Sequence, residues 1–251
     1  MSVLVDRPAP GVARLRIDRP DARNAIDAGV RAGLKAALAE ARDDPAVRAL
    51  VLAGTGGMFS AGGDLPSLVG LDEAAAYARL CDGHAAVSAL WTFPKPVVAA
   101  VEKFAIGAGA GLALLADLVV TGETARFGFP FARLGLVPDW GLSATLPRRI
   151  GAEPAARLFA EAVTVSAREA LALGIADEAA SDDAVMAAAL ARAAALARTA
   201  PDAFARTKLA LRGDVSVLGL EREARDQAAC LVSAEFAEGY AAFREKREPR
   251  F

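Results

Sequence analysis

The stretch that decides the fold runs Lys95-Pro-Val-Val-Ala-Ala-Val-Glu-Lys-Phe-Ala-Ile-Gly-Ala-Gly-Ala-Gly-Leu-Ala-Leu-Leu-Ala-Asp117. Valines with small residues between them predict a buried strand from Val97 to Val101. Glycines follow at positions 107, 109 and 111, the apolar residues 112–116 predict a helix, and a second strand is expected over residues 118–121. A strand, a glycine turn and a buried helix direct free backbone N–H groups into the space above the turn.

The glycine turn does not have the pattern of a dinucleotide-binding loop, because a further glycine of that pattern would fall at Leu112. A phosphate-binding P-loop would need Gly-Lys-Ser or Gly-Lys-Thr, and the turn contains no lysine. Two interpretations stay open on this segment alone. Either the glycines let a helix and a strand pack closely, or they form an oxyanion site from main-chain N–H groups.

A second glycine-rich loop lies upstream, where a strand expected over residues 49–53 runs into Gly54-Thr-Gly-Gly-Met-Phe-Ser-Ala-Gly-Gly-Asp-Leu65. Two such loops, each following a buried strand, would supply one N–H apiece to a single carbonyl oxygen. Together the two stretches resemble the crotonase (enoyl-CoA hydratase/isomerase) family. The resemblance is also carried by Arg19-Pro-Asp-Ala-Arg-Asn-Ala-Ile26, Arg133-Leu-Gly-Leu-Val-Pro-Asp139 and Glu238-Gly-Tyr-Ala-Ala-Phe-Arg-Glu-Lys-Arg-Glu-Pro-Arg-Phe251.

Strand and helix signals alternate along the first half of the chain. A strand is expected over residues 12–17, a helix over residues 28–42 with Asp27 as its N-cap, and a helix from the cap Asp72 to Trp91. This alternation predicts an α/β fold with parallel strand pairing. From residue 142 onward the signals are nearly all helical, with a capping box at Ser166 and Glu169, an alanine-rich helix over residues 182–198, and two or three helices over residues 204–247.

The resemblance makes the expected fold more specific: α/β, with a crotonase-like ββα spiral core and a C-terminal helical segment. We expect residues 1–199 to form the core that binds and converts the acyl-CoA. Residues 200–251 would form the helical segment that serves oligomerisation and contacts the CoA adenine. The family also implies a homo-oligomer, either a trimer or a dimer of trimers.

Composition narrows the range of partners. The chain has 251 residues and a formal net charge of −2, which gives no basis for a nucleic-acid-binding surface. Cys81 and Cys230 lie in unrelated contexts, as expected of reduced thiols in a cytoplasmic protein. The N-terminus has no signal-peptide pattern, and the longest charge-free apolar run, residues 104–116, is too short to cross a bilayer. We therefore expect a cytoplasmic protein with no membrane partner.

The resemblance implies roles for backbone groups in both glycine loops. The N–H groups of Gly63 and Ala108 match the pair that polarises the thioester carbonyl and stabilises the enolate. Neither position needs a side chain, because the role requires only close backbone approach. The same resemblance places further residues along the bound CoA thioester, namely Ala25, Ala61, Asp64, Leu65, Phe131 and Trp140.

Two departures from the family pattern bear on the reaction. In the hydratases of this family two glutamates hold and activate water, and the matching positions here are Gly111 and Phe131. Without these carboxylates, the usual general acid and base are missing, so ordinary hydration is not expected. Glutamate introduced at both positions would be expected to raise hydration of a 2-enoyl thioester.

One carboxylate does match a family position. Asp139, in Leu136-Val-Pro-Asp-Trp-Gly141, matches the aspartate of double-bond isomerases and the nucleophilic aspartate of aromatic acyl-CoA dehalogenases. Burial beside Trp140, Phe131 and Phe129 would raise the pKa of Asp139 and suit it to proton transfer. The alternative is a turn aspartate that caps a helix from Leu142. The family context favours catalysis.

Four further residues have alternative interpretations. His84 matches a site histidine of the aromatic acyl-CoA dehalogenases, but a lone helical histidine is more often a surface residue or a satisfied buried one. Arg23 matches a basic residue near the CoA phosphates. Phe243 and Lys246 match a pair that meets the adenine end from a neighbouring subunit. The alternative for all three is solvated surface.

The predicted function is therefore proton transfer at an acyl-CoA thioester, most simply double-bond isomerisation. Asp139 would move the proton while the N–H groups of Gly63 and Ala108 hold the enolate oxygen. The sequence carries no metal-ligand or redox-cofactor motif, so coenzyme A is expected only as part of the substrate. Two alternatives stay open: a hydrolase or dehalogenase with Asp139 as nucleophile, and a non-catalytic acyl-CoA-binding protein.

Overall fold

The computed structural model describes residues 2–251 and contains two β-sheets. The larger sheet has the strand order β1-β2-β3-β4-β6-β9, in which β1 and β2 are antiparallel and every other pair is parallel. In the smaller sheet β5 pairs parallel with β7, and β7 pairs antiparallel with β8. The strands are β1 (Val3–Ala9), β2 (Val12–Ile17), β3 (Ala49–Gly54), β4 (Val97–Val101), β5 (Phe104–Ile106), β6 (Leu118–Gly122), β7 (Arg126–Gly128), β8 (Thr164–Ser166) and β9 (Glu178–Ala180).

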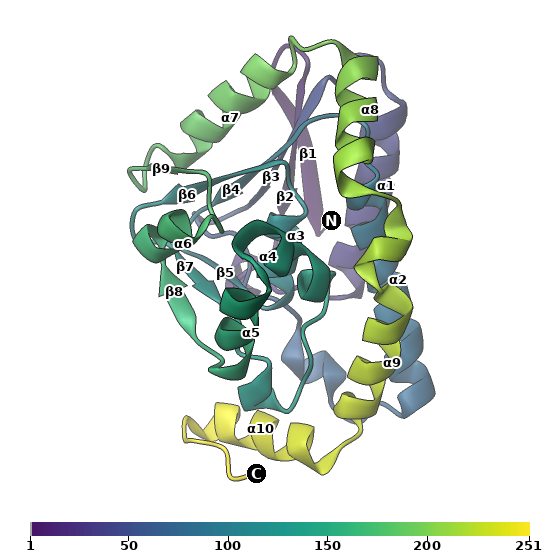
Figure 1. The fold of residues 1–251 in the computed structure, drawn as a ribbon, viewed down its shortest axis with the longest axis vertical. Helices are drawn as coiled ribbons and strands as arrows, with labels where there is room; N and C mark the ends of the chain where they lie inside the picture. Colours follow the sequence, from purple (N-terminus) through teal and green to yellow (C-terminus); the bar gives the residue numbers. More distant parts are fainter. Residues whose placement is uncertain (1) are drawn as a thin grey trace.

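Ten α-helices and four short 3-10 helices accompany the sheets within residues 2–251 (Figure 1). No helix of this part of the chain is both long and apolar enough to cross a membrane. The α-helices are α1 (Ala28–Asp43), α2 (Glu73–Trp91), α3 (Ala108–Leu114), α4 (Leu142–Ile150), α5 (Ala152–Ala160), α6 (Ala167–Leu173), α7 (Val185–Leu196), α8 (Pro201–Arg212), α9 (Leu220–Leu231) and α10 (Ala234–Glu245). The 3-10 helices are η1 (Pro20–Ala22), η2 (Leu65–Leu68), η3 (Ala132–Leu134) and η4 (Val215–Leu218).

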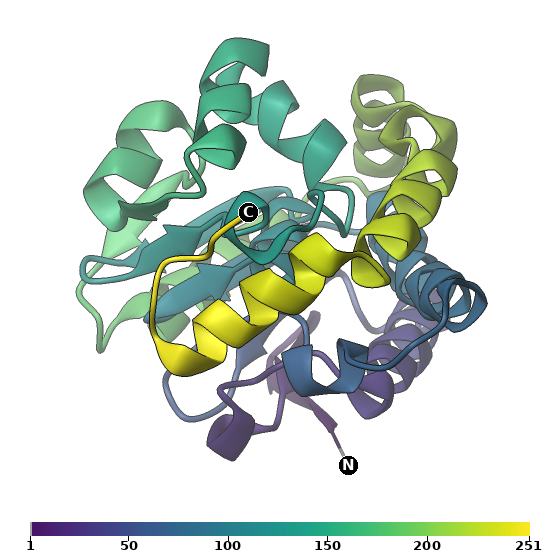
Figure 2. The same ribbon diagram turned by 90° about the horizontal axis from the view of Figure 1, so that it is seen from below.

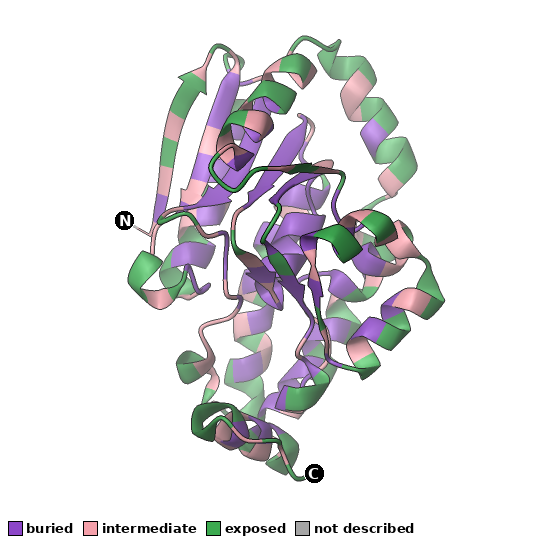
Figure 3. Cartoon of the chain, turned by 90° about the vertical axis from the view of Figure 1, so that its left-hand side faces the viewer, coloured by how far each residue is buried: buried purple, intermediate pink, exposed green. Residues whose placement is uncertain are grey.

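The central strands of the larger sheet are buried on both faces, which explains why they are continuous apolar runs rather than alternating ones. Helix α7 covers one face, and its buried Val185, Ala189 and Ala193 pack on valines and alanines of the sheet. The opposite face contributes to the main core, which also includes α1, α2 and α3. Figure 3 shows the central strands buried almost along their whole length.

Most of the expected elements of the first half are present. Asp27 caps α1 through the Val30 N–H, and Asp72 caps α2 through the Ala75 N–H. The expectation for the glycine stretch was partly wrong, because α3 begins at Ala108 rather than at Leu112. Only Gly107, with a φ of 52°, forms the turn, and the two later glycines lie inside the helix.

The expected all-helical second half was also incomplete. The capping box of Ser166 and Glu169 is present, and α7 lies within the expected alanine-rich segment. The strands β8 and β9, three residues each, were missed because such short strands leave no periodic signal. The 204–247 region contains most of α8 together with η4, α9 and α10.

Helix α10 runs across one end of the molecule (Figure 2). It packs against η3, and two glycines allow this close approach. A Cβ on Gly239 would lie 2.6 Å from the Leu134 carbonyl carbon, and one on Gly135 would lie 2.6 Å from the Glu235 carbonyl carbon. The C-terminal helix is therefore seated on the core of its own chain.

Candidate active site

The two glycine loops are joined by a short parallel β-bridge between Ser60 and Ala105. The Ser60 N–H donates to the Phe104 carbonyl, and the Ile106 N–H donates to the Ser60 carbonyl, each at 3.1 Å. Three residues beyond the two bridged residues come Gly63 and Ala108. The pairing of β5 with the upstream loop thus brings together the two backbone amides that the sequence singled out.

A glycine at position 62 makes this close approach possible. Gly62 has a φ of 93°, and a Cβ there would lie 2.4 Å from the Ile106 carbonyl oxygen and 3.4 Å from the Ala108 nitrogen. Any side chain at this position would push the two loops apart. Gly62 was not among the predicted site residues, although its place in Ala61-Gly-Gly-Asp64 gave a visible signal.

Both predicted oxyanion donors are available. Among the hydrogen bonds formed by residues 2–251, neither the Gly63 N–H nor the Ala108 N–H has an acceptor. Ala108 is the first residue of α3, so its N–H has no partner within the helix. Gly63 faces open space, since a Cβ built there would touch no atom within 4 Å.

The two donors face a cavity of 590 Å³ that also contains Asp139 and Phe131. Its wall is largely apolar, which would keep water away from a bound acyl group and strengthen the hydrogen bonds made there. The predicted contact residues Ala61 and Leu65 also line this cavity. The wall is completed by residues of β5, η3 and α10, among them Ile106, Leu134, Ala242 and Phe243, and by Leu136 just after η3.

Among the cavity-lining residues of the described chain, 2–251, Asp139 carries the one carboxylate outside the C-terminal tail. The residue is half-buried, and its Oδ1 is closed off from solvent without a hydrogen-bond partner in residues 2–251. Its Oδ2 accepts a hydrogen bond of 3.3 Å from the Gln227 side-chain amide. Burial, and next the negative charge of Glu223, raise the pKa of Asp139 to about 7.

The geometry excludes the helix-cap interpretation of Asp139. The N-cap of α4 is Gly141, and the Leu142 N–H donates to the backbone carbonyl of Asp139 rather than to its carboxylate. The side chain is therefore free to face the cavity. Its place there requires left-handed backbone at the next two residues, with φ values of 57° at Trp140 and 73° at Gly141.

Helix α9 holds this loop on both sides of Asp139. Glu223 accepts hydrogen bonds from the Gly141 N–H at 3.1 and 3.2 Å, and one turn later Gln227 accepts one of 3.0 Å from the Val137 N–H. Glu223 and Gln227 are both almost fully buried. Neither was among the predicted site residues, because α9 carries several other charged residues and the sequence alone does not single out these two.

His84 is a satisfied buried residue rather than a surface residue or a cavity residue. Its Nε2 lies 2.8 Å from Glu223 Oε1, and its side chain is 8 % exposed. The histidine supports the carboxylate that holds the Asp139 loop. Its predicted alternative role as a direct site residue finds no support in the cavity lining formed by residues 2–251.

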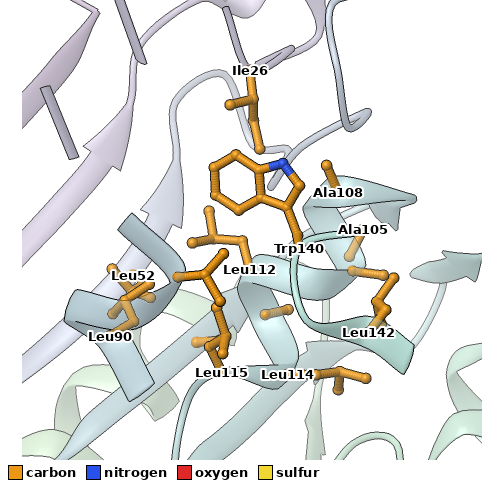
Figure 4. Close-up of a cluster of buried hydrophobic side chains, with 14 of the residues drawn as sticks. Ile26, Leu52, Leu90, Ala105, Ala108, Leu112, Leu114, Leu115, Trp140 and Leu142 are labelled. Carbon is orange, nitrogen blue, oxygen red and sulfur yellow. The ribbon is translucent and has the colours of Figure 1, made fainter. Parts of the chain in front are cut away.

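Trp140 fills the space above Gly111. A Cβ on Gly111 would lie 2.6 Å from the Trp140 Cβ and 3.0 Å from the Trp140 carbonyl oxygen. Figure 4 shows the indole within the buried cluster that includes Ile26, Leu112 and Ala108. No side chain fits at position 111 unless this loop moves, so the expectation that Gly111 could simply be replaced by glutamate was wrong.

The aromatic residues near the site have different places. Phe131 lines the cavity and packs edge-on against Phe159, with ring centroids 6.3 Å apart. Phe129 is fully buried and also packs on Phe159, at 5.8 Å. The expectation that Phe129 flanks the reacting group was wrong, because it belongs to the core behind Phe131.

Basic residues gather at the mouth of the cavity. Phe243 on α10 and Lys246, the C-cap of α10, line it as expected, but they come from the same chain, where the expectation was a neighbouring subunit. Arg133 and Arg247 line the mouth as well and are paired with Glu248 and Glu238. Such cations fit the phosphates of a coenzyme A thioester.

The remaining predicted contact residues do not line the cavity among residues 2–251. The described lining does not include Arg23, Ala25 or Asp64. The Arg23 carbonyl accepts from the N–H of the lining residue Ala61, and Asp64 lies 3.5 Å from Arg19. Within residues 2–251 no three His, Cys, Asp or Glu side chains are placed to hold a metal ion.

Comparison with known proteins gives a consistent result. Residues 8–251 match the family model described as enoyl-CoA hydratase/isomerase. The chain is 39% identical over 246 residues to a probable enoyl-CoA hydratase of Rhodobacter capsulatus, covering 96% of this chain and 94% of that one. It is 34% identical over 255 residues to the 2,3-dehydroadipyl-CoA hydratase of Escherichia coli, covering 100% and 99%. The crystal structure of an enoyl-CoA hydratase/isomerase from Pseudoalteromonas atlantica superposes with a TM-score of 0.89 at 33% identity, covering 100% of both chains.

Proposed function

The chain belongs to the enoyl-CoA hydratase/isomerase family, and from this premise we propose that it moves a carbon–carbon double bond within an acyl-CoA thioester by proton transfer. Members of this family act on acyl-CoA substrates. The expected crotonase-like α/β fold is confirmed by the structural neighbours. The finer assignment, isomerisation rather than hydration, rests on the side chains of the cavity.

In the proposed reaction the thioester oxygen accepts hydrogen bonds from the N–H groups of Gly63 and Ala108. The Asp139 carboxylate removes a proton from one carbon of the acyl group, and the negative charge moves onto the thioester oxygen as an enolate. The protonated Asp139 then returns the proton to a different carbon, and the double bond shifts. No water or other reactant is consumed, and Asp139 ends in the state in which it began.

The observation that carries the proposal is the Oδ1 atom of Asp139, which is shielded and unpartnered in residues 2–251 and belongs to the cavity of the two free amides. A carboxyl group with a pKa of about 7 is half ionised at neutral pH and can both take up and release a proton. Hydration would need the paired glutamates of the family's hydratases. Here Trp140 occupies the space above Gly111, and Phe131 stands at the other position.

The proposal is tested by incubating the protein with saturated, 2-enoyl and 3-enoyl CoA thioesters in deuterated water and following deuterium at the alpha and gamma carbons. We expect exchange and double-bond movement, and a loss of turnover of about 100- to 10,000-fold in Asp139→Asn with little change in thioester affinity. Hydration of crotonyl-CoA at about 10 per second or faster would contradict the proposal. A trapped acyl-aspartate would indicate the hydrolytic alternative.

We also propose that the protein works in the cytoplasm as a trimer or a dimer of trimers, as the resemblance implied. Large apolar side chains exposed on α8 support an assembly, with Leu209 53% and Leu211 81% exposed. In such an assembly α10 still closes the cavity of its own chain, so each subunit would carry a complete site.

A further inference from the structure

A side cavity of 40 Å³ adjoins the main cavity at Asp139. Four residues line both spaces, namely Gly63, Leu68, Asp139 and Gln227. The side cavity therefore begins beside one oxyanion donor and the proposed acid–base residue. An acyl group held at that donor has its next few carbons within reach of this space.

Two arginines line the side cavity, and some of the N–H groups of their guanidinium groups have no hydrogen-bond acceptor in residues 2–251. Arg79 on α2 donates to the Ser67 hydroxyl at 2.8 Å and, among residues 2–251, has no carboxylate within 4 Å. Arg31 on α1 binds Asp82 at 2.7 Å through its Nε alone, and its two terminal nitrogens have no hydrogen-bond acceptor in the described chain. Each guanidinium thus keeps N–H groups available for a ligand.

The nearby carboxylates, Asp139 among them, favour the charged form of Arg79 but offset only part of the effects that lower its pKa, and none in residues 2–251 lies within 4 Å of its guanidinium. Asp27 and Asp64 form ion pairs with Arg19 instead, at 3.2 and 3.5 Å. Burial and the positive charge of Arg31 lower the pKa of Arg79, so the cation stands in an environment that disfavours it. Half-buried cations normally have an anionic partner, and this one has a neutral hydroxyl instead.

The remaining walls show what kind of ligand would fit. Leu80 and Trp140 provide apolar surface, and Gly83 adds no side chain. A water molecule needs about 10–15 Å³ of such space, so 40 Å³ takes a group of a few heavy atoms. A planar carboxylate has this size, and its two oxygens match the paired N–H groups of a guanidinium.

We propose that the side cavity binds a carboxylate at the far end of the acyl group, so that the substrates are CoA thioesters of short dicarboxylic acids. This inference rests on the proposed acyl-CoA function and specifies its substrate class. The length is short because Asp139 lines both cavities, which places the carboxylate a few carbons from the reacting ones. The two arginines offset the repulsion that the substrate carboxylate would otherwise exert on Asp139.

The inference is tested by calorimetric binding of saturated thioesters, which need no turnover. Glutaryl-CoA and pentanoyl-CoA have equally long acyl chains and differ in the terminal carboxylate, as do succinyl-CoA and butanoyl-CoA. We expect the native protein to prefer the carboxylated member of a pair by about tenfold or more, the scale of one charge-assisted contact. Arg79→Gln should lower that preference by about tenfold.

Two control variants test whether the effect of Arg79→Gln comes from losing the guanidinium charge in the side cavity. Ser67→Ala removes the hydroxyl partner of Arg79 but keeps the guanidinium, and Arg42→Gln removes an exposed arginine of α1. Both should keep the preference. Equal affinity of the native protein for both members of each pair would overturn the inference while leaving the acyl-CoA function intact. Binding of none of the four thioesters would overturn the proposed function and this inference together.

Discussion

Replacing the Asp139 carboxyl group should make the protein more stable, and increasingly so as the pH rises. Asp139→Asn keeps the shape of the side chain and an oxygen that can accept from Gln227, but it cannot ionise. The ordinary pKa of the carboxyl group is 3.8, and burial with the charge of Glu223 raises it to about 7 in the folded chain. Between these values the unfolded chain ionises while the folded chain stays protonated, so ionisation favours unfolding.

The sign and size follow from the two pKa values. Below pH 3.8 both states are protonated, and the stabilising effect of the raised pKa is fully present; it is lost as the pH rises through about 7. A difference of about 3 units at 1.36 kcal/mol per unit gives an upper limit of about 4 kcal/mol. Because the residue is only half-buried, we expect Asp139→Asn to gain about 2–4 kcal/mol above pH 7 and almost nothing near pH 4.

The assay is urea unfolding followed by circular dichroism from pH 4 to pH 9, at one fixed protein concentration because assembly would add to the apparent stability. A control of opposite sign is Asp182→Asn, since hydrogen bonds from Thr124 lower the pKa of Asp182. That variant should lose stability at neutral pH. A stability difference between Asp139→Asn and the native protein that stays constant over the whole range would refute the assigned environment of Asp139.

Two further changes follow from the packing. Gly111→Glu should destabilise the protein by about 2 kcal/mol or more and fail to create hydratase activity, because its Cβ would meet Trp140 at 2.6 Å. The comparison variant is Phe131→Glu, because Phe131 lines the cavity and its replacement meets no such clash. Both variants are measured by urea unfolding and by crotonyl-CoA hydration. A Gly111→Glu variant that is as stable as the native protein and hydrates crotonyl-CoA would contradict this reasoning. Light scattering should find a trimer or a hexamer. Leu211 on α8 is 81% exposed, so Leu211→Glu should weaken this assembly. A native protein that is a stable and active monomer at micromolar concentration would rule the assembly out.

The sequence predicted the parts of the fold that depend on local patterns. The strands around Val51 and Val98 and the caps Asp27 and Asp72 are set by apolar runs and by short-range hydrogen bonds, which a single sequence displays. The start of α3 was misplaced because glycine is a poor helix former, and here close packing overrides that propensity. Only the structure shows that a Cβ at position 109 would lie 2.9 Å from the Ser60 Cβ, so that the helix and the upstream loop pack too closely for a side chain there.

The candidate site was predictable where a motif fixed it and not where distant segments meet. Gly63, Ala108 and Asp139 were identified from residues near them in the sequence, and all three line the cavity. Glu223 and Gln227 lie more than eighty positions from the loop they hold, so no local pattern connects them to Asp139. Arg79 was missed for the same reason, since helix α2 brings it to the site from outside every motif.

The position of Asp139, the proposed acid–base residue, is set by α9 rather than by the glycine loops that first pointed to the family. Left-handed backbone at a bulky residue such as Trp140 costs about 1–2 kcal/mol, so the loop needs support to keep it. Glu223 provides that support at the Gly141 N–H and Gln227 at the Val137 N–H, one helical turn apart. The charge of Glu223 that holds the backbone also raises the pKa of Asp139. Glu223 thus helps to fix the position of Asp139 and adds to the effect of burial, which is the larger cause of the raised pKa.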